Sequence, residues 1–145
     1  RMTTGTLKTM RRMLLGLLAF GLAGTTTELS LMGHYEDWQQ IIPLVGMGLS
    51  LLALVWCGAT WSGRAVWVLR ACMLLLMISG VTGTVLHYRA NMEFQLEMDA
   101  SIAGWALMSK VLHAKAPPAL APGNMALLGL LGLISTLAVR NNEPC

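Results

Sequence analysis

One stretch of this sequence decides the fold: residues 65–86 read AVWVLRACMLLLMISGVTGTVL and carry a single charge, at Arg70. An α-helix needs roughly 20 apolar residues to cross about 30 Å of hydrocarbon, and this run has that length. Because lipid cannot satisfy backbone N–H and C=O groups, such a run must be a helix or part of a closed barrel. The run is rich in Leu and Met without strict alternation, which favours a helix.

Three further apolar runs accompany it, at residues 13–33, 41–61 and 122–139. The 145-residue chain is 55% hydrophobic and only 12% charged, against roughly 25% charged in an average soluble domain. The sequence therefore predicts an all-α integral membrane protein. We expect a single domain over residues 1–145, with four transmembrane helices in an up-down bundle.

The first run follows basic residues, which is also the pattern of a cleaved signal peptide. It is long for the apolar core of such a peptide, and no Ala-x-Ala-like site lies near its end. We therefore expect a membrane crossing there.

Lysine and arginine near the ends of the crossings predict the orientation, since the richer side stays cytoplasmic. If the first helix starts inside, the inner side holds Arg1, Lys8, Arg11, Arg12, Arg64 and Arg140, and the outer side holds Arg89, Lys110 and Lys115. Both termini are then cytoplasmic, in a bacterial inner membrane. No Lys/Arg-rich stripe with interleaved aromatics accompanies the net charge of +3, so we expect no nucleic-acid partner.

The longest connection is the predicted outer loop, residues 87–121. Its part 101–114 predicts a short amphipathic helix at the outer membrane interface. Segment 92–99 alternates apolar and polar residues like a half-buried strand, yet its residue types also favour helix, so both interpretations stay open. The candidate partner-binding residues are large and apolar, the kind that concentrates binding energy: Phe94, Ile102, Trp105, Met108 and Leu112.

Glu28 falls within the first crossing, near its outer end, where a carboxylate is costly unless it is paired, protonated or turned inward. It is either a structural group bonded to neighbouring hydroxyls or to His34, or the coupling carboxylate of a transporter. Four crossings with one such carboxylate resemble the architecture of the small multidrug-resistance transporters. The chain lacks that family's motifs, and its long outer loop departs from their compact form.

Three histidines, His34, His87 and His113, are expected on the outer side near carboxylates. Imidazole with carboxylate can hold a transition metal, and two histidines can hold a tetrapyrrole pigment. No His-x-x-His or Cys-x-x-Cys spacing supports such a site, so interfacial hydrogen bonding is the simpler interpretation and no cofactor is assigned. No motif of a nucleophile elbow, phosphate loop, dinucleotide site or zinc protease occurs either, and we expect no enzyme.

These features favour a non-catalytic accessory or scaffolding subunit of a larger bacterial inner-membrane complex. It would contact the bilayer and other membrane-protein subunits, docking through the outer loop and through small-residue helix faces. Those faces contain Gly21, Thr25, Gly46, Ser50, Ser79, Gly83, Gly129 and Gly132. The alternatives are a small ion- or drug-coupled transporter that uses Glu28, and an outer-face metal or pigment binder that uses His34 and His87.

The topology is testable by cysteine labelling in a variant whose native cysteines are replaced by serine. We expect Glu93→Cys to react with an impermeant thiol reagent added outside, because position 93 lies in the outer loop. Arg64→Cys, the matched control, should react only once the cytoplasmic face is opened. Labelling of Glu93→Cys from the cytoplasmic face alone would refute this topology.

Overall fold

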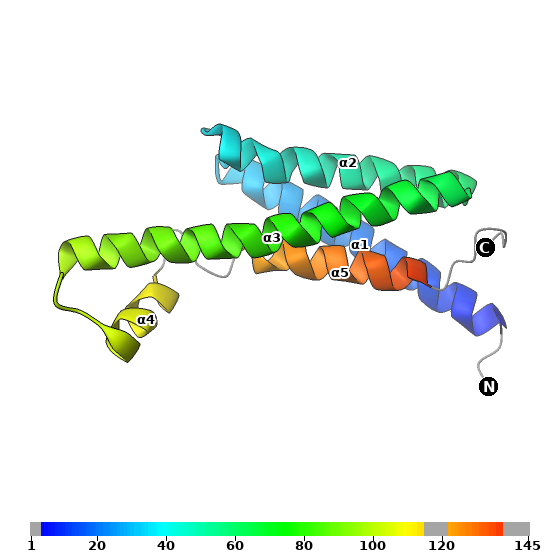
Figure 1. The fold of residues 1–145 in the computed structure, drawn as a ribbon. Coiled ribbons are helices and arrows are strands. Elements are labelled where there is room, and N and C mark those ends of the chain that lie inside the picture. The colour runs from blue at the N-terminus through cyan, green and yellow to red at the C-terminus, as the bar shows by residue number, and fades with distance from the viewer. Residues whose placement is uncertain (1–3, 115–121, 138–145) are drawn as a thin grey trace. The chain divides into compact units, whose positions relative to one another are not determined.

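A computed structural model describes residues 4–114 and 122–137 of the chain (Figure 1). These residues form helices and turns and contain no strand. The described helices are α1 (Thr4–Leu31), α2 (Trp38–Thr60), α3 (Gly63–Met98), α4 (Gly104–Leu112) and α5 (Gly123–Leu137). Among them, α1, α2 and α3 are long and apolar enough to cross a membrane. The fold is thus all-helical and fits a helical membrane protein.

The fourth predicted crossing is only partly described. Helix α5 has 15 residues, or about 22 Å at the usual rise, which is short of the roughly 30 Å of hydrocarbon. The last two residues of the predicted run 122–139 lie outside the described residues. The four-helix bundle therefore stays a prediction.

Helix α3 is longer than the sequence predicts. It was expected over 65–86, but it continues without a break to Met98 and has 36 residues. Segment 92–99 is thus helical up to Met98, and the strand interpretation does not hold there. Met, Glu, Gln and Leu are good helix formers, and the described residues offer no strand with which this segment could pair.

The chain divides into two compact units, each described by itself. The first is Arg1–Met77 with Leu127–Cys145, and the second is Ile78–Ala126. Both α3 and α5 contribute residues to each unit. In the first unit, α1 and α2 contact each other and a buried core joins them to α3; its fully buried side chains include Leu18, Leu22, Met47, Leu69 and Met73.

A left-handed glycine separates α1 from α2. Gly33 has φ +69°, and its N–H donates to Ser30 O at 3.2 Å while the N–H of His34 donates to Leu29 O at 3.0 Å. This pair of bonds is a Schellman motif, which satisfies carbonyls that the end of a helix would otherwise leave open. The motif ends α1 two residues before the predicted boundary of the crossing.

Helix α5 packs against α3 in the first unit at backbone distance (Figure 1). A Cβ added at Gly129 would lie 2.5 Å from the carbonyl oxygen of Met73 and 2.8 Å from the nitrogen of Met77. Further along α5, the carbonyl and hydroxyl oxygens of Thr136 accept hydrogen bonds from Arg70. The later residue of α5, Thr136, thus meets the earlier residue of α3, Arg70, so the two helices are antiparallel.

The other glycine faces also contact the chain's own helices. A Cβ at Gly21 would lie 2.5 Å from Leu128 Cδ2, within the first unit. In the second unit, a Cβ at Gly80 would lie 2.5 Å from the nitrogen of Ala126. These glycines allow close helix packing inside the chain, which is the usual role of small residues in membrane helices.

Replacing Gly129 by alanine tests this packing. We expect Gly129→Ala to lower the free energy of unfolding by about 1–3 kcal/mol, because the new methyl group meets backbone atoms that cannot rotate away. Unfolding in mild detergent with increasing denaturant gives the measurement. Gly48→Ala is the matched control, since a Cβ there meets nothing within 4 Å. Equal stability of the two variants would contradict the contact.

Candidate functional site

The predicted partner-binding residues all belong to the second unit. Phe94 lies on α3, Ile102 lies in the turn that follows, and Trp105, Met108 and Leu112 lie on α4. Phe94 is 57% exposed and Trp105 is 75% exposed. Met108 and Leu112 are also exposed, and Ile102 is half-buried. The structure therefore leaves most of this apolar set on the surface of the chain.

Helix α4 turns the face that carries Val111 inward. Val111 is fully buried and Leu107, one turn earlier, is half-buried, whereas Trp105 is largely exposed. The face through Trp105 and Met108 was predicted to bind a partner, and no inward face was predicted for this helix. The i, i+4 spacing of Leu107 and Val111 was a signal for the inner face, but on so short a helix two apolar faces compete.

The turn between α3 and α4 is built around Asp99. Its Oδ1 accepts a hydrogen bond from the Ser101 hydroxyl at 2.6 Å and one from the Ser101 N–H at 3.1 Å. These donors favour the ionised carboxylate and hold the pKa of Asp99 below its usual range. Helix α4 begins only at Gly104, which has φ +59°, so neither Asp99 nor Ser101 caps it.

Acidic side chains lie beside the exposed apolar ones. Glu93, Glu97 and Asp99 are exposed on the last turns of α3 and just after it, and Met98 between them is 73% exposed. We call Phe94, Met98, Ile102, Trp105, Met108 and Leu112, with these three carboxylates, the outer segment. This surface combines large apolar side chains with carboxylates.

Glu28 is exposed on α1. The neighbouring hydroxyls of Thr26, Thr27 and Ser30 each donate to the carbonyl four residues back, at 2.7 to 2.8 Å. In the described part of the chain, the carboxylate itself has no hydrogen bond or ion pair. At this depth in lipid, an ionised carboxylate would need a partner from outside the described residues.

The three predicted histidine ligands lie in both units. His34 belongs to the first unit, and His87 and His113 belong to the second. His113 Nδ1 lies 2.8 Å from the carbonyl oxygen of Ser109, one turn earlier on α4. Within residues 4–114 and 122–137, no group of three or more His, Cys, Asp or Glu side chains is placed to hold a metal ion.

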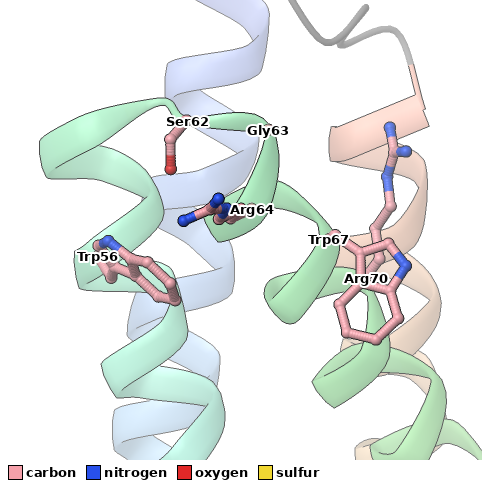
Figure 2. Close-up of a pocket in the computed structure, with 6 residues that line it drawn as sticks. All are labelled: Trp56, Ser62, Gly63, Arg64, Trp67 and Arg70. Atoms are coloured by element: carbon pink, nitrogen blue, oxygen red, sulfur yellow. The ribbon is translucent and has the colours of Figure 1, made fainter.

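A cleft of about 720 Å³ lies at the turn between α2 and α3 (Figure 2). Its lining residues are mostly basic or aromatic: Trp56, Ser62, Gly63, Arg64, Trp67 and Arg70. In Figure 2 the Arg64 guanidinium points towards the Trp56 side, whereas the Arg70 side chain extends towards the end of α5. The cleft is open on one side, so it can admit a group from the surrounding medium.

Local geometry fixes the shape of this turn. Trp61 ends α2 in the left-handed conformation at φ 47°, which costs a non-glycine residue about 1–2 kcal/mol. The Arg11 guanidinium of α1 lies 5.9 Å from the centre of the Trp61 ring, a cation–π contact. The Ser62 hydroxyl then accepts the N–H of Ala65 at 3.2 Å and caps α3.

Sequence reasoning did not find this cleft. Arg64 was used only to set the topology, and Trp56 and Trp67 stand eleven positions apart in the sequence. The signal was a pair of tryptophans and a pair of arginines around a very short connection. Whether these side chains line one cleft depends on how α3 leaves α2, and the left-handed backbone of Trp61 sets that direction.

Comparisons with known proteins found no matching family model, no matching curated protein and no matching solved structure.

The Asp99 turn gives a test by pH titration. We expect Ser101→Ala to raise the pKa of Asp99 towards its usual range, because one of the two donors to the carboxylate is lost. In the native chain the turn is stabilised at any pH above the usual aspartate pKa. This stabilisation is lost as the pH falls through the lowered pKa of the folded state.

Carbon-13 NMR of the Asp99 carboxyl group, followed against pH in micelles, gives the Asp99 pKa in the native chain and in Ser101→Ala. The pKa should rise only in part, since the Ser101 N–H still donates. An unchanged Asp99 pKa in Ser101→Ala would contradict the role of the hydroxyl.

Proposed function

We propose that this chain is a non-catalytic accessory subunit of a larger complex in the bacterial inner membrane, and that it binds its partner through the outer segment. The observation that carries the proposal is the exposure of large apolar side chains where α3 continues beyond its apolar, membrane-spanning part. Four crossings with both termini cytoplasmic complete the proposal.

The length of α3 shows why lipid alone is a poor cover for this surface. At 1.5 Å per residue its 36 residues span about 54 Å, against about 30 Å of hydrocarbon. Even at a tilt of about 40°, the upper end of the usual range, the helix rises about 41 Å. The part after residue 86 begins with His87, Tyr88 and Arg89, so this is the end that leaves the acyl chains.

Beyond that point water would meet Phe94 and Met98 directly. A patch of large apolar residues with a polar rim is the usual mark of a protein interaction site. Glu93, Glu97 and Asp99 give the rim a negative charge, which favours a basic surface on the partner and repels an acidic one. We therefore propose a partner with an apolar groove bordered by lysine or arginine.

The packing of α5 supports the fourth crossing. Because α5 runs antiparallel to α3 and its end is held by Arg70, it leads the chain back to the side where α3 begins. Arg64 at the start of α3 and Arg11 beside Trp61 make that end basic. The positive-inside tendency then makes it the cytoplasmic end.

The glycine faces add no support for docking to another subunit, since they contact the chain's own helices. The second candidate function is an ion- or drug-coupled transporter, and the observation that favours it is the exposed carboxylate of Glu28 on α1. A carboxylate at membrane depth that lacks a partner among the described residues is a functional group by default. The same exposure fits an accessory subunit whose neighbour covers Glu28, so it does not displace the first proposal.

Replacing the two aromatic anchors tests the docking surface. We expect Phe94→Ala with Trp105→Ala to lower recovery of the native complex about tenfold or more, because buried aromatic anchors often contribute 2 kcal/mol or more each. Affinity purification of the tagged full-length chain, with quantitative mass spectrometry of the chains recovered, gives the measurement.

The matched control is Phe20→Ala with Leu52→Ala. These side chains are 77% and 69% exposed but lie within the spans α1 and α2, where lipid covers them. Both double variants should insert and elute like the native chain. Equal recovery of the same partners with the native chain and with the Phe94/Trp105 variant would defeat the docking proposal.

A further inference from the structure

We propose that the cleft at the α2–α3 turn, lined by Arg64, Arg70, Trp56 and Trp67, binds the phosphate group of an anionic lipid headgroup. This site is separate from the outer segment. It requires the chain to lie in a membrane, but it does not depend on the accessory role.

The charge of the cleft favours an anion. Arg64 is exposed, and within the described part of the chain its guanidinium has no hydrogen-bond acceptor and no ion-pair partner. Arg70 is half-buried, and its bonds to Thr136 fix its side chain. Guanidinium groups bind phosphate oxygens through paired N–H donors, so the Arg64 guanidinium beside the cleft is a suitable anion ligand. Arg70 also lines the cleft and adds positive charge there, although its guanidinium is bonded to Thr136.

No carboxylate competes for these arginines within the cleft, since none of its lining residues is acidic. The described acidic residues of the first unit, Glu28, Glu36 and Asp37, lie around the α1–α2 turn. That turn precedes the start of α2, whereas the cleft lies at its end. The full length of α2 therefore separates these carboxylates from Arg64.

The first turn of α3 adds neutral donors. Ser62 already accepts the N–H of Ala65 through its hydroxyl and that of Val66 through its carbonyl. Among the described residues, the N–H groups of Gly63 and Arg64 have no acceptor. Free N–H groups at the start of a helix attract anions, and here they border the same cleft as the two arginines.

The two tryptophans indicate the depth of the cleft. Trp56 is 43% exposed near the end of the span α2, and Trp67 is 70% exposed near the start of the span α3. Indole rings at the ends of membrane helices favour the headgroup region, which is where lipid phosphates lie. A volume of about 720 Å³ is also within the range of small-ligand sites.

The chemistry recognised is a phosphate group, which a lipid headgroup and free phosphate share. The test uses the purified full-length chain in an uncharged detergent, titrated with short-chain phosphatidylglycerol and with phosphatidylcholine of the same chain length. Native mass spectrometry reports the bound lipid, and a parallel titration adds inorganic phosphate as a competitor.

We expect phosphatidylglycerol to bind more tightly than phosphatidylcholine. Arg64→Gln should weaken phosphatidylglycerol binding roughly fivefold, in keeping with the loss of one basic contact to an anionic lipid. Arg12→Gln is the control: it removes the same charge from an exposed position on α1 outside the lining of the cleft, and should change binding less than about twofold.

Two other outcomes would overturn the assignment of the cleft to an anionic lipid. Equal binding of the two lipids, or equal losses in the two variants, would leave only a general positive surface and no site. Displacement of the lipid by millimolar phosphate in the native chain but not in Arg64→Gln would assign the cleft to free phosphate instead. Because none of these measurements involves the outer segment, their failure leaves the accessory role standing.

Discussion

Hydrocarbon offers a peptide group no hydrogen-bond partner, so a chain in lipid has to bond its own N–H and C=O groups. The described residues fold into helices, and several hydroxyls of those helices donate to the backbone of their own helix: Ser50, for example, is fully buried and bonds to Gly46 O at 2.7 Å. Within the described residues, no buried side-chain nitrogen or oxygen lacks a partner. With polar groups satisfied locally, contact between helices depends on close fit, which glycine supplies where α5 meets α3.

Polar and charged groups remain where the helices begin or end, and there they acquire distinct chemistry. The α2–α3 turn gathers arginines and tryptophans, whereas the last turns of α3 and the turn to α4 carry carboxylates beside exposed apolar side chains. Arg70 belongs to the first group and has a second role, because it satisfies the last described turn of α5. One side chain thus links helix packing to the proposed phosphate site.

The candidate site was predictable in part. Trp105 and Phe94 were selected as large apolar residues outside the main apolar runs, and the structure leaves both exposed. The burial of Val111 was not predicted, because which face of a nine-residue helix is buried depends on what that helix packs against. The arginine and tryptophan cleft was missed for a related reason: its residues come from both sides of a turn whose direction depends on the left-handed backbone of Trp61.

The sequence by itself determined that this chain is helical and fits a membrane, because apolar runs of the necessary length have few other solutions in lipid. It did not determine where α3 ends. Segment 92–99 has a pattern with two allowed interpretations, and in the structure it continues α3 as a helix up to Met98. Its residues favour helix, and the described residues offer no strand with which it could pair. The tertiary structure alone decided that the glycine faces meet the chain's own helices, and that Arg64 and Trp56 share one cleft. Such contacts join residues far apart in sequence or across a turn, and local sequence patterns do not tell which of these residues meet.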